Sequence, residues 1–183
     1  RLAIEWHVDL KRTLLVKMFQ APLLQLLRED IFRKQIRTVC QEVACPHAFG
    51  CPEREVGGFL VGVKSECTDG SLRFPEVVSA IRASGAVEGP SRLTFTHETW
   101  EVAHSEIEVH RERDGRPFEI VGWYHSHPYQ GIFLSGMDLF IHRNFFSDPQ
   151  QFAVVVDPLS RAFGAFIWKD GEVVSLFEQS IGC

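Results

Sequence analysis

The chain has 183 residues, of which 45% are hydrophobic and 23% are charged, and its formal net charge is -5. This length suits one globular domain, and the apolar fraction is too high for a disordered chain. The acidic balance and the lack of a Lys/Arg run argue against nucleic acid as a partner. No apolar stretch is long enough to span a bilayer, so we expect no membrane contact.

The first thirty residues carry the least information. The chain begins at Arg1 rather than at Met, so we expect a fragment or a processed chain. We assign residues 1–30 to an N-terminal extension of unknown role and residues 31–183 to the domain itself. Helix-like spacing of apolar residues then predicts an amphipathic helix from Ile31 to Val43. Its apolar stripe consists of Ile31, Ile36, Val39 and Val43.

Five cysteines are spread through the chain, and this odd number does not suggest a disulfide scaffold. A reducing, cytoplasmic setting is therefore expected. Cys40, Cys45, His47 and Cys51 lie around a predicted loop from Cys45 to Pro52. They could form a second, structural zinc site, because Cys3His sets bind zinc. The alternatives are a buried helix thiol followed by loop thiols, or a disulfide.

From Glu55 onward the pattern changes to strands with two inserted helices. Val56 to Val63 is an apolar, Gly-containing run typical of a buried strand, and Asp69-Gly70 predicts a hairpin turn. This order indicates an α+β, or mixed α/β, domain around one curved sheet. The further predicted strands are Leu72–Ala83, Leu93–Phe95, Phe118–Tyr124, Phe152–Val156, Ala162–Trp168 and Val173–Phe177, and the helices are Thr96–Arg111 and Ser135–Phe146.

Two histidines and an aspartate form the most informative pattern. Residues i and i+2 of a strand face the same side, so His125 and His127 can direct two imidazoles at one point. Pro128 ends the strand because it cannot donate to the ladder. A short loop then leads to a helix that begins near Ser135, with Asp138 in its first turn. The loop can fold back, so Asp138 can complete a three-ligand set.

Two His, one carboxylate and a free fourth position are typical of catalytic zinc sites. Zinc lowers the pKa of a bound water to ~7, a base must accept its proton, and an oxyanion must be stabilised. The Ser135 hydroxyl is placed for the last task. Two plainer interpretations remain: a chance His-x-His pair, and Ser135 with Asp138 as a helix N-cap. Capping and ligation are compatible, because a capped helix is a rigid mount for a ligand.

Two neighbouring features of these elements lead to further expectations. His142 follows Asp138 by one helical turn on the same face, which predicts a supporting role behind the ligands. Trp123 and Tyr124 are consecutive on the predicted strand, so we expect one of them in the core and the other facing out.

The run from Gly122 to Pro128, followed by Ser135 and Asp138, resembles the JAMM motif, H-x-H-P-x6-S-x2-D, of the MPN/JAB family of metallopeptidases. Every fixed position of that motif is present. Family members also carry a Glu just before a Gly-rich apolar strand, and Glu55 followed by Val56–Gly62 matches this element.

The resemblance extends from about Ile31 to Phe177. It implies the MPN/JAB-like form of the α+β class, a curved and mostly antiparallel sheet flanked by helices. It also implies an active zinc metallopeptidase with one catalytic Zn²⁺. The implied roles are zinc ligation by His125, His127 and Asp138, general acid/base catalysis by Glu55, and stabilisation of the tetrahedral intermediate by Ser135.

The resemblance implies conjugates of ubiquitin or of a ubiquitin-like protein as substrates, and E1- or E2-like enzymes of the same pathway as partners. An MPN scaffold subunit with latent activity, or a processing peptidase for a sulfur-carrier precursor, stays open as an alternative. The family branch is open too. Phe95 to Trp100 is more similar to the prokaryotic JAB branch, whereas Gly122 to Pro128 is also similar to the eukaryotic deubiquitinases.

The loop between the His pair and Ser135 must border the cleft. We therefore expect it to contact an extended modifier tail, with a backbone that comes close at its glycine and with apolar side chains beside it. The alternative is that the apolar residues only anchor the loop on the domain. The residues in question are Tyr129, Gly131, Ile132 and Phe133.

Overall fold

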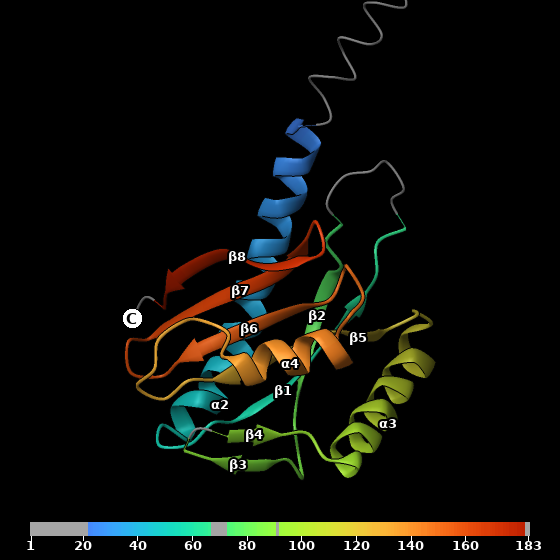
Figure 1. Cartoon of the computed structure of the whole chain (residues 1–183). Coiled ribbons are helices and arrows are strands. Elements are labelled where there is room, and N and C mark those ends of the chain that lie inside the picture. Colours follow the sequence, from blue (N-terminus) through green and yellow to red (C-terminus); the bar gives the residue numbers. More distant parts are fainter. Residues whose placement is uncertain (1–21, 67–72, 91, 182–183) are drawn as a thin grey trace, which may run out of the picture.

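The computed structural model describes residues 22–66, 73–90 and 92–181. The turn predicted at Asp69-Gly70 and most of the predicted N-terminal extension lie outside these residues. A six-stranded sheet, in the order β2-β1-β5-β6-β7-β8, forms the centre of the domain (Figure 1). Its strands are β1 (Gly57–Val63), β2 (Glu76–Arg82), β5 (Glu119–Ser126), β6 (Phe152–Asp157), β7 (Ala162–Lys169) and β8 (Glu172–Ser180).

All neighbouring strands of this sheet pair antiparallel except β5 and β6, which are parallel. A parallel pair needs a crossover connection, and α4 (Gly136–Phe145) lies in the one between β5 and β6. The expected α+β class with a mostly antiparallel sheet is therefore confirmed. The crossover matters for function, because it begins immediately after the His pair and leads the chain through α4 to β6, the parallel neighbour of β5.

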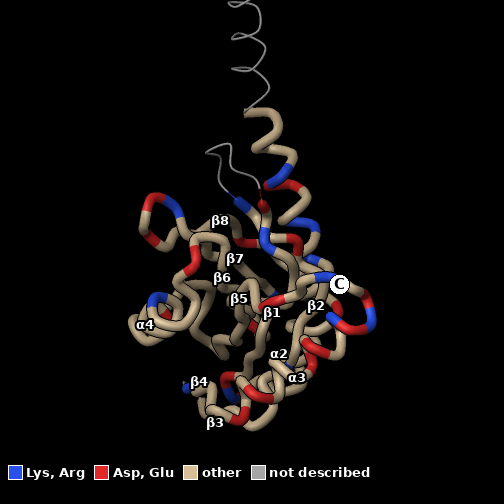
Figure 2. The backbone as a smooth tube through the Cα atoms, turned by 90° about the vertical axis from the view of Figure 1, so that its right-hand side faces the viewer, with Lys and Arg blue, Asp and Glu red and all other residues tan. Residues whose placement is uncertain are grey.

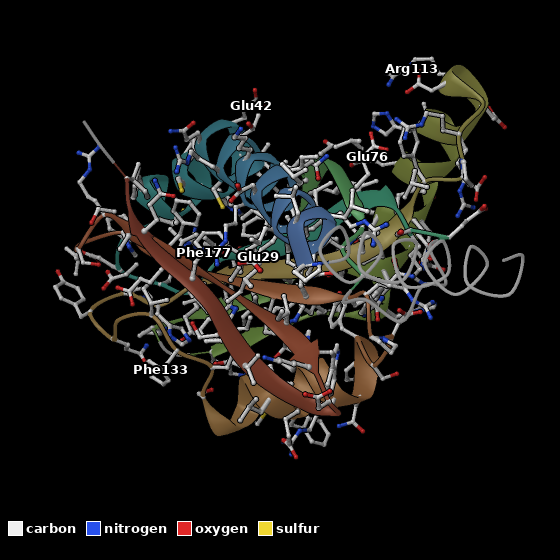
Figure 3. The ribbon with its side chains drawn as sticks, turned by 90° about the horizontal axis from the view of Figure 1, so that it is seen from above. Glu29, Glu42, Glu76, Arg113, Phe133 and Phe177 are labelled. Carbon is white, nitrogen blue, oxygen red and sulfur yellow. The ribbon has the colours of Figure 1, made fainter. Side chains whose placement is uncertain are left out.

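Helices cover both faces of the sheet. One face carries a continuous helical segment, which runs through residues 22–39, the π-helix η1 (Cys40–Ala44) and α2 (Cys45–Gly50). The opposite face carries α4, and α3 (His97–Asp114) packs into the same core. The view from above shows the first helical segment and α4 on opposite sides of the strands (Figure 3). No described helix is both long and apolar enough to cross a membrane.

Two apolar cores result, one on each face. Phe32, Ile36 and Val39 of the first helical segment pack with Tyr124 of β5, while Ile107 of α3 packs with the core of the other face. The central strands are almost free of charged residues, which lie mainly at strand ends and on the helices (Figure 2). Both faces of β5 are therefore shielded from solvent, and a polar site at the end of this strand can be buried.

Three local expectations are wrong. Cys45 to Pro52 is not a loop, because α2 occupies most of it. Pro46 lies in the first turn of α2, after a π-turn in which the Cys45 N–H bonds to the Cys40 carbonyl, so its missing N–H is tolerated. Ile31 is 56% exposed, and its neighbour Phe32 takes its place in the buried stripe.

The third correction concerns Trp123 and Tyr124, which are both buried. They do point to opposite faces, but a helix covers each face, so neither side chain reaches solvent. Finally, the helix of residues 22–39 passes residue 31 without a break. The domain boundary placed there stays a prediction.

A small hairpin, β3 (Val87–Gly89) and β4 (Arg92–Thr94), stands beside the main sheet. The Glu55 N–H donates to the Gly89 carbonyl at 2.7 Å, which fixes this hairpin to the entry of β1. Thr96 then caps α3 through a reciprocal pair of hydrogen bonds with Thr99. The hairpin and α3 therefore stand at defined positions next to the end of β5.

Candidate metal centre

The two histidines of the motif lie where β5 ends. Backbone hydrogen bonds continue the pairing past the strand, from Ser126 N–H to the Val56 carbonyl at 2.8 Å and from His127 N–H to the Val156 carbonyl at 2.9 Å. His125 and His127 are held rigidly from both sides and are fully buried. Their Nε2 atoms are 3.0 Å apart, so the two imidazoles converge on one point.

Asp138 reaches the same point from α4. Its Oδ1 is 3.3 Å from the Nε2 of His125, and its Oδ2 is 3.3 Å from the Nε2 of His127. The helix is also capped as a Ser-x-x-Asp pattern predicts: the Asp138 N–H donates to the Ser135 hydroxyl at 3.2 Å, and the Ser135 N–H donates to the carboxylate at 2.7 Å. Capping thus fixes the carboxylate instead of competing with the histidines for it.

These three side chains fit a metal ion. Their ligand atoms lie within 4.8 Å of one another, and no other such group of His, Cys, Asp or Glu occurs among residues 22–66, 73–90 and 92–181. Two imidazole nitrogens and one carboxylate oxygen are borderline and hard ligands that suit zinc. Burial alone would raise the pKa of Asp138, but hydrogen bonds from both imidazoles and from Ser135 lower it well below its ordinary value, so the carboxylate is ionised.

The cysteines near α2 do not form a second centre of this kind. Cys40, Cys45 and Cys51 are free thiols. His47 is occupied elsewhere, because its Nδ1 forms a 2.9 Å hydrogen bond with the Tyr124 hydroxyl. Within the described part of the chain, the structure therefore supports neither the zinc nor the disulfide alternative for this cluster.

Glu55 lies just before β1, and its side chain faces His125, His127 and Asp138 without being one of these three converging side chains. It is 7% exposed, and the Gln130 amide donates to its carboxylate at 3.3 Å. Burial raises the pKa of Glu55, partly offset by its interactions with His125 and His127. A carboxylate with a raised pKa, beside a metal-ligand group, can both accept and return a proton.

A cleft of about 620 Å³ joins these residues. Glu55, His127, Ser135 and Asp138 line its polar part. The remaining wall is mostly apolar and comes from β4, the start of α3, the outer face of α4 and one residue of the loop between His127 and Ser135. Sequence reasoning missed this wall, because nothing in the spacing of its residues places them together. Its members are Arg92, Leu93, Thr94, Phe95, Trp100, Gln130, Met137, Phe140, Ile141 and Phe145.

The four loop residues predicted to contact substrate lie beside the cleft, but none of them lines it. Tyr129 is 76% exposed, and Ile132 packs against Gly164. Phe133 lies with its ring centroid 4.8 Å from that of His127. Gly131 has a φ of 84°, and its carbonyl accepts a 3.3 Å hydrogen bond from Nδ1 of His127. That bond leaves the Nε2 of His127 free to bind a metal.

His142 lies one helical turn after Asp138, but its hydrogen bond is with Trp123 and not with one of the three candidate ligands. It is fully buried, and its Nδ1 accepts a 3.0 Å hydrogen bond from the indole N–H of Trp123. Burial lowers the pKa of His142 to about 4, so the ring is neutral at pH 7.

This burial has a consequence for stability. An unfolded His has a pKa of ~6.5. Between pH 6.5 and about 4, the unfolded state therefore binds a proton that His142 does not bind in the folded state. The free energy of unfolding therefore falls as the pH falls through that window. Urea unfolding of the zinc-free protein at pH 7 and pH 5 checks this. Between pH 7 and pH 5, the free energy of unfolding of His142→Asn is expected to fall by about 2 kcal/mol less than that of the wild type. An equal fall in the free energy of unfolding of both proteins would contradict a neutral, buried His142.

A mostly antiparallel sheet presents two buried histidines to the aspartate of a capped crossover helix, and this arrangement agrees with the JAB/MPN resemblance of the sequence motif. Residues 39–151 match the family described as "JAB1/Mov34/MPN/PAD-1 ubiquitin protease". The chain belongs to this family, which confirms the resemblance noted in the sequence.

Several known proteins are similar over part of the chain. AMSH-like ubiquitin thioesterase 2 of Arabidopsis thaliana is 40% identical over 67 residues, which are 35% of this chain and 30% of that protein. Lys-63-specific deubiquitinase BRCC36 of Rattus norvegicus is 30% identical over 116 residues, 53% of this chain and 40% of that protein. The 26S proteasome regulatory subunit rpn11 of Schizosaccharomyces pombe is 42% identical over 57 residues, 31% and 18% of the two chains. The chain thus spans less than half the length of each.

Proposed function

We propose that this chain is a zinc-dependent isopeptidase that removes ubiquitin or a ubiquitin-like modifier from a target protein. The observation that carries this proposal is the convergence of three buried ligand atoms, from His125, His127 and Asp138, in one cleft with Glu55. A purely structural zinc site would fill its fourth position with a protein ligand. Here the described residues offer three, and the cleft reaches two of them.

Zinc, when bound by His125, His127 and Asp138, supplies Lewis-acid activation of water and of the scissile carbonyl. Glu55 accepts a proton from the attacking water and returns it to the leaving amine, which for an isopeptide bond is the lysine side chain. Its position is fixed by the hydrogen bond from Gln130 and by the strand entry that the hairpin holds in place.

Ser135 donates a hydrogen bond from its hydroxyl to the oxyanion that develops during attack. The arrangement of the N-cap supports this role. The Ser135 oxygen accepts from the Asp138 N–H, so its own proton is not needed for capping and can point into the cleft that the residue lines. A donor preorganised in this way is worth about 10²–10³-fold in rate in other hydrolases.

The substrate class is supported by the names of the relatives, which include a ubiquitin thioesterase and a Lys-63-specific deubiquitinase. We extend this to ubiquitin or ubiquitin-like conjugates for the present chain, with E1- and E2-like enzymes of the same pathway as its functional neighbours. Tyr129, Gly131, Ile132 and Phe133 remain proposed contacts of the modifier or of the target, beside the cleft.

The proposed substrate leads to a test. Ubiquitin-like proteins fused to a reporter through an intact Gly-Gly end should be cut, whereas ends changed to Phe-Phe should be cut at least ~10-fold more slowly, because the proposed tail passes directly beside the metal ligands, where bulky side chains would clash. Gel assays of the zinc-loaded chain measure both rates. Equal rates would contradict recognition of a modifier tail and would favour a general peptidase.

A further inference from the structure

Helix α4 is joined to strand β5 by two contacts that lie one behind the other. The first is the contact between His125 and Asp138, with 3.3 Å between ring nitrogen and carboxylate oxygen. The second is the 3.0 Å hydrogen bond that Trp123 donates to Nδ1 of His142. The first contact belongs to the proposed metal centre. The second involves two residues that do not line the cleft, and none of the catalytic roles assigned above involves it.

The distance between the two contact residues on β5 matches the distance between their two partners on α4. Trp123 and His125 are two residues apart on a strand, which is ~6.6 Å. Asp138 and His142 are four residues apart on a helix, which is ~6 Å along its axis. Both contacts therefore form in a single register of α4 on β5. A helix displaced by one residue would lose both at once, so the remote contact also controls the position of the Asp138 carboxylate.

The orientation of His125 depends on the same place. A histidine that binds a metal is normally oriented by a hydrogen bond on its other ring nitrogen. His127 has such a bond, to the Gly131 carbonyl. Nδ1 of His125 is buried and has no hydrogen-bond partner in the described part of the chain. Its ring is instead stacked on the indole of Trp123, with centroids 4.5 Å apart and planes only 10° from parallel.

The indole can hold His125 only if it is itself fixed, and it is fixed on several sides. Trp123 is fully buried, and Phe146 stacks on it with a centroid distance of 5.6 Å. Its N–H is directed by His142, whose ring stacks on Trp168 at 5.1 Å. Trp168 in turn donates to the Phe146 carbonyl, the C-cap of α4, at 2.9 Å.

We propose that Trp123 and His142 are a positioning pair: their hydrogen bond sets α4 on β5, and the indole face orients His125, so that the pair preorganises the metal ligands without touching the metal. The inference rests on the proposed zinc centre. It predicts that changes at either residue weaken metal binding, although neither residue is a ligand.

Two variants of nearly equal size isolate the hydrogen bond. In His142→Asn the amide oxygen takes the place of Nδ1 and can still accept from the indole. In His142→Leu no acceptor remains. Zinc affinity is measured by competition with a chromophoric chelator. His142→Leu should bind zinc ~10–100-fold more weakly, the usual cost of losing an outer-shell partner, and His142→Asn should stay within about threefold of the wild type.

The other partner gives a second line of evidence. Trp123→Phe keeps an aromatic face for His125 but removes the N–H donor, so it should weaken zinc binding as His142→Leu does. The double variant should be little worse than either single one, because both remove the same interaction. The visible spectrum of the cobalt-loaded protein should change in Trp123→Phe and in His142→Leu, and stay close to the wild type in His142→Asn.

Tyr124→Phe is the matched control. It removes one partly buried 2.9 Å hydrogen bond, to His47, from the opposite face of the same strand. It should lower the Tm of the zinc-free protein and leave zinc affinity unchanged. If His142→Leu and Trp123→Phe also lowered only the Tm, the pair would be ordinary packing and this inference would be overturned. If the wild type itself bound no zinc, the proposed metal centre would fail instead, so the two failures are distinguishable.

Discussion

Replacing Glu55 by Gln is expected to abolish turnover and to leave the zinc content unchanged. The amide has nearly the same shape and can still interact with Gln130, but it cannot accept a proton from water at neutral pH. General acid/base catalysis is worth typically ~10²–10⁴-fold, so the loss of kcat should be at least of that order. Cleavage of a fluorogenic isopeptide substrate, together with elemental analysis of the same sample, measures both quantities.

Glu53→Gln is the control for this variant. Glu53 lies two residues earlier and is exposed, whereas Glu55 is buried at the cleft, so the same chemical change at Glu53 should leave both readings at wild-type values. Full activity of Glu55→Gln would refute the assigned acid/base role. Loss of zinc in that variant would make Glu55 a ligand rather than a base.

The second large effect is expected at the proposed metal ligands. His127→Ala leaves one imidazole and one carboxylate, and two ligands are too few for a stable zinc site. Zinc affinity should fall by more than the ~10–100-fold that loss of an outer-shell partner costs, and activity should be lost with it. The measurement is zinc content after gel filtration in the presence of a weak chelator.

The control for this substitution is His97→Ala, because His97 lies on α3 with its side chain 89% exposed. It should retain one zinc ion per chain. An unchanged zinc content in His127→Ala would remove this residue from the ligand set. The hydrogen bond that orients the ring, from His127 to the Gly131 carbonyl, would then need another explanation.

Much of the fold follows from local patterns. The run Phe152–Val156 is apolar at every position and forms β6 (Phe152–Asp157), because a strand covered by helices on both faces has no polar side. The end of β5 follows from the His-x-His-Pro run, in which alternation directs both rings one way. Ser135 and Asp138 are short-range signals too, and the N-cap they predict is present.

The failures share a physical cause: burial by partners that are distant in sequence. Alternation predicts that Trp123 and Tyr124 point in opposite directions, but it cannot show that a helix covers each side. The role of Trp123 is hidden for the same reason, because its partner His142 is 19 residues away on another element. The apolar wall of the cleft joins β4, α3 and α4, which only the tertiary fold brings together.

Pro46 illustrates a different kind of error. Pro is a strong signal of a loop, but at the first turn of a helix it costs nothing. In the π-turn just before it, the Cys45 N–H donates to the Cys40 carbonyl, so the helical hydrogen-bonding pattern has already changed when the chain reaches Pro46. Composition therefore predicted an irregular loop where the chain continues as a helix and buries Cys45 and Ala48 against the sheet.

We propose that His125, His127 and Asp138 hold a zinc ion and that Glu55 acts beside this ion in the hydrolysis of an isopeptide bond. The test is cleavage of an isopeptide-linked ubiquitin dimer by the purified chain before chelation, after removal of metal, and after zinc is added back. The expected result is cleavage that disappears with the metal and returns with one equivalent of zinc. Cleavage that persists in the metal-free chain, or its absence from the zinc-loaded chain, would contradict this account.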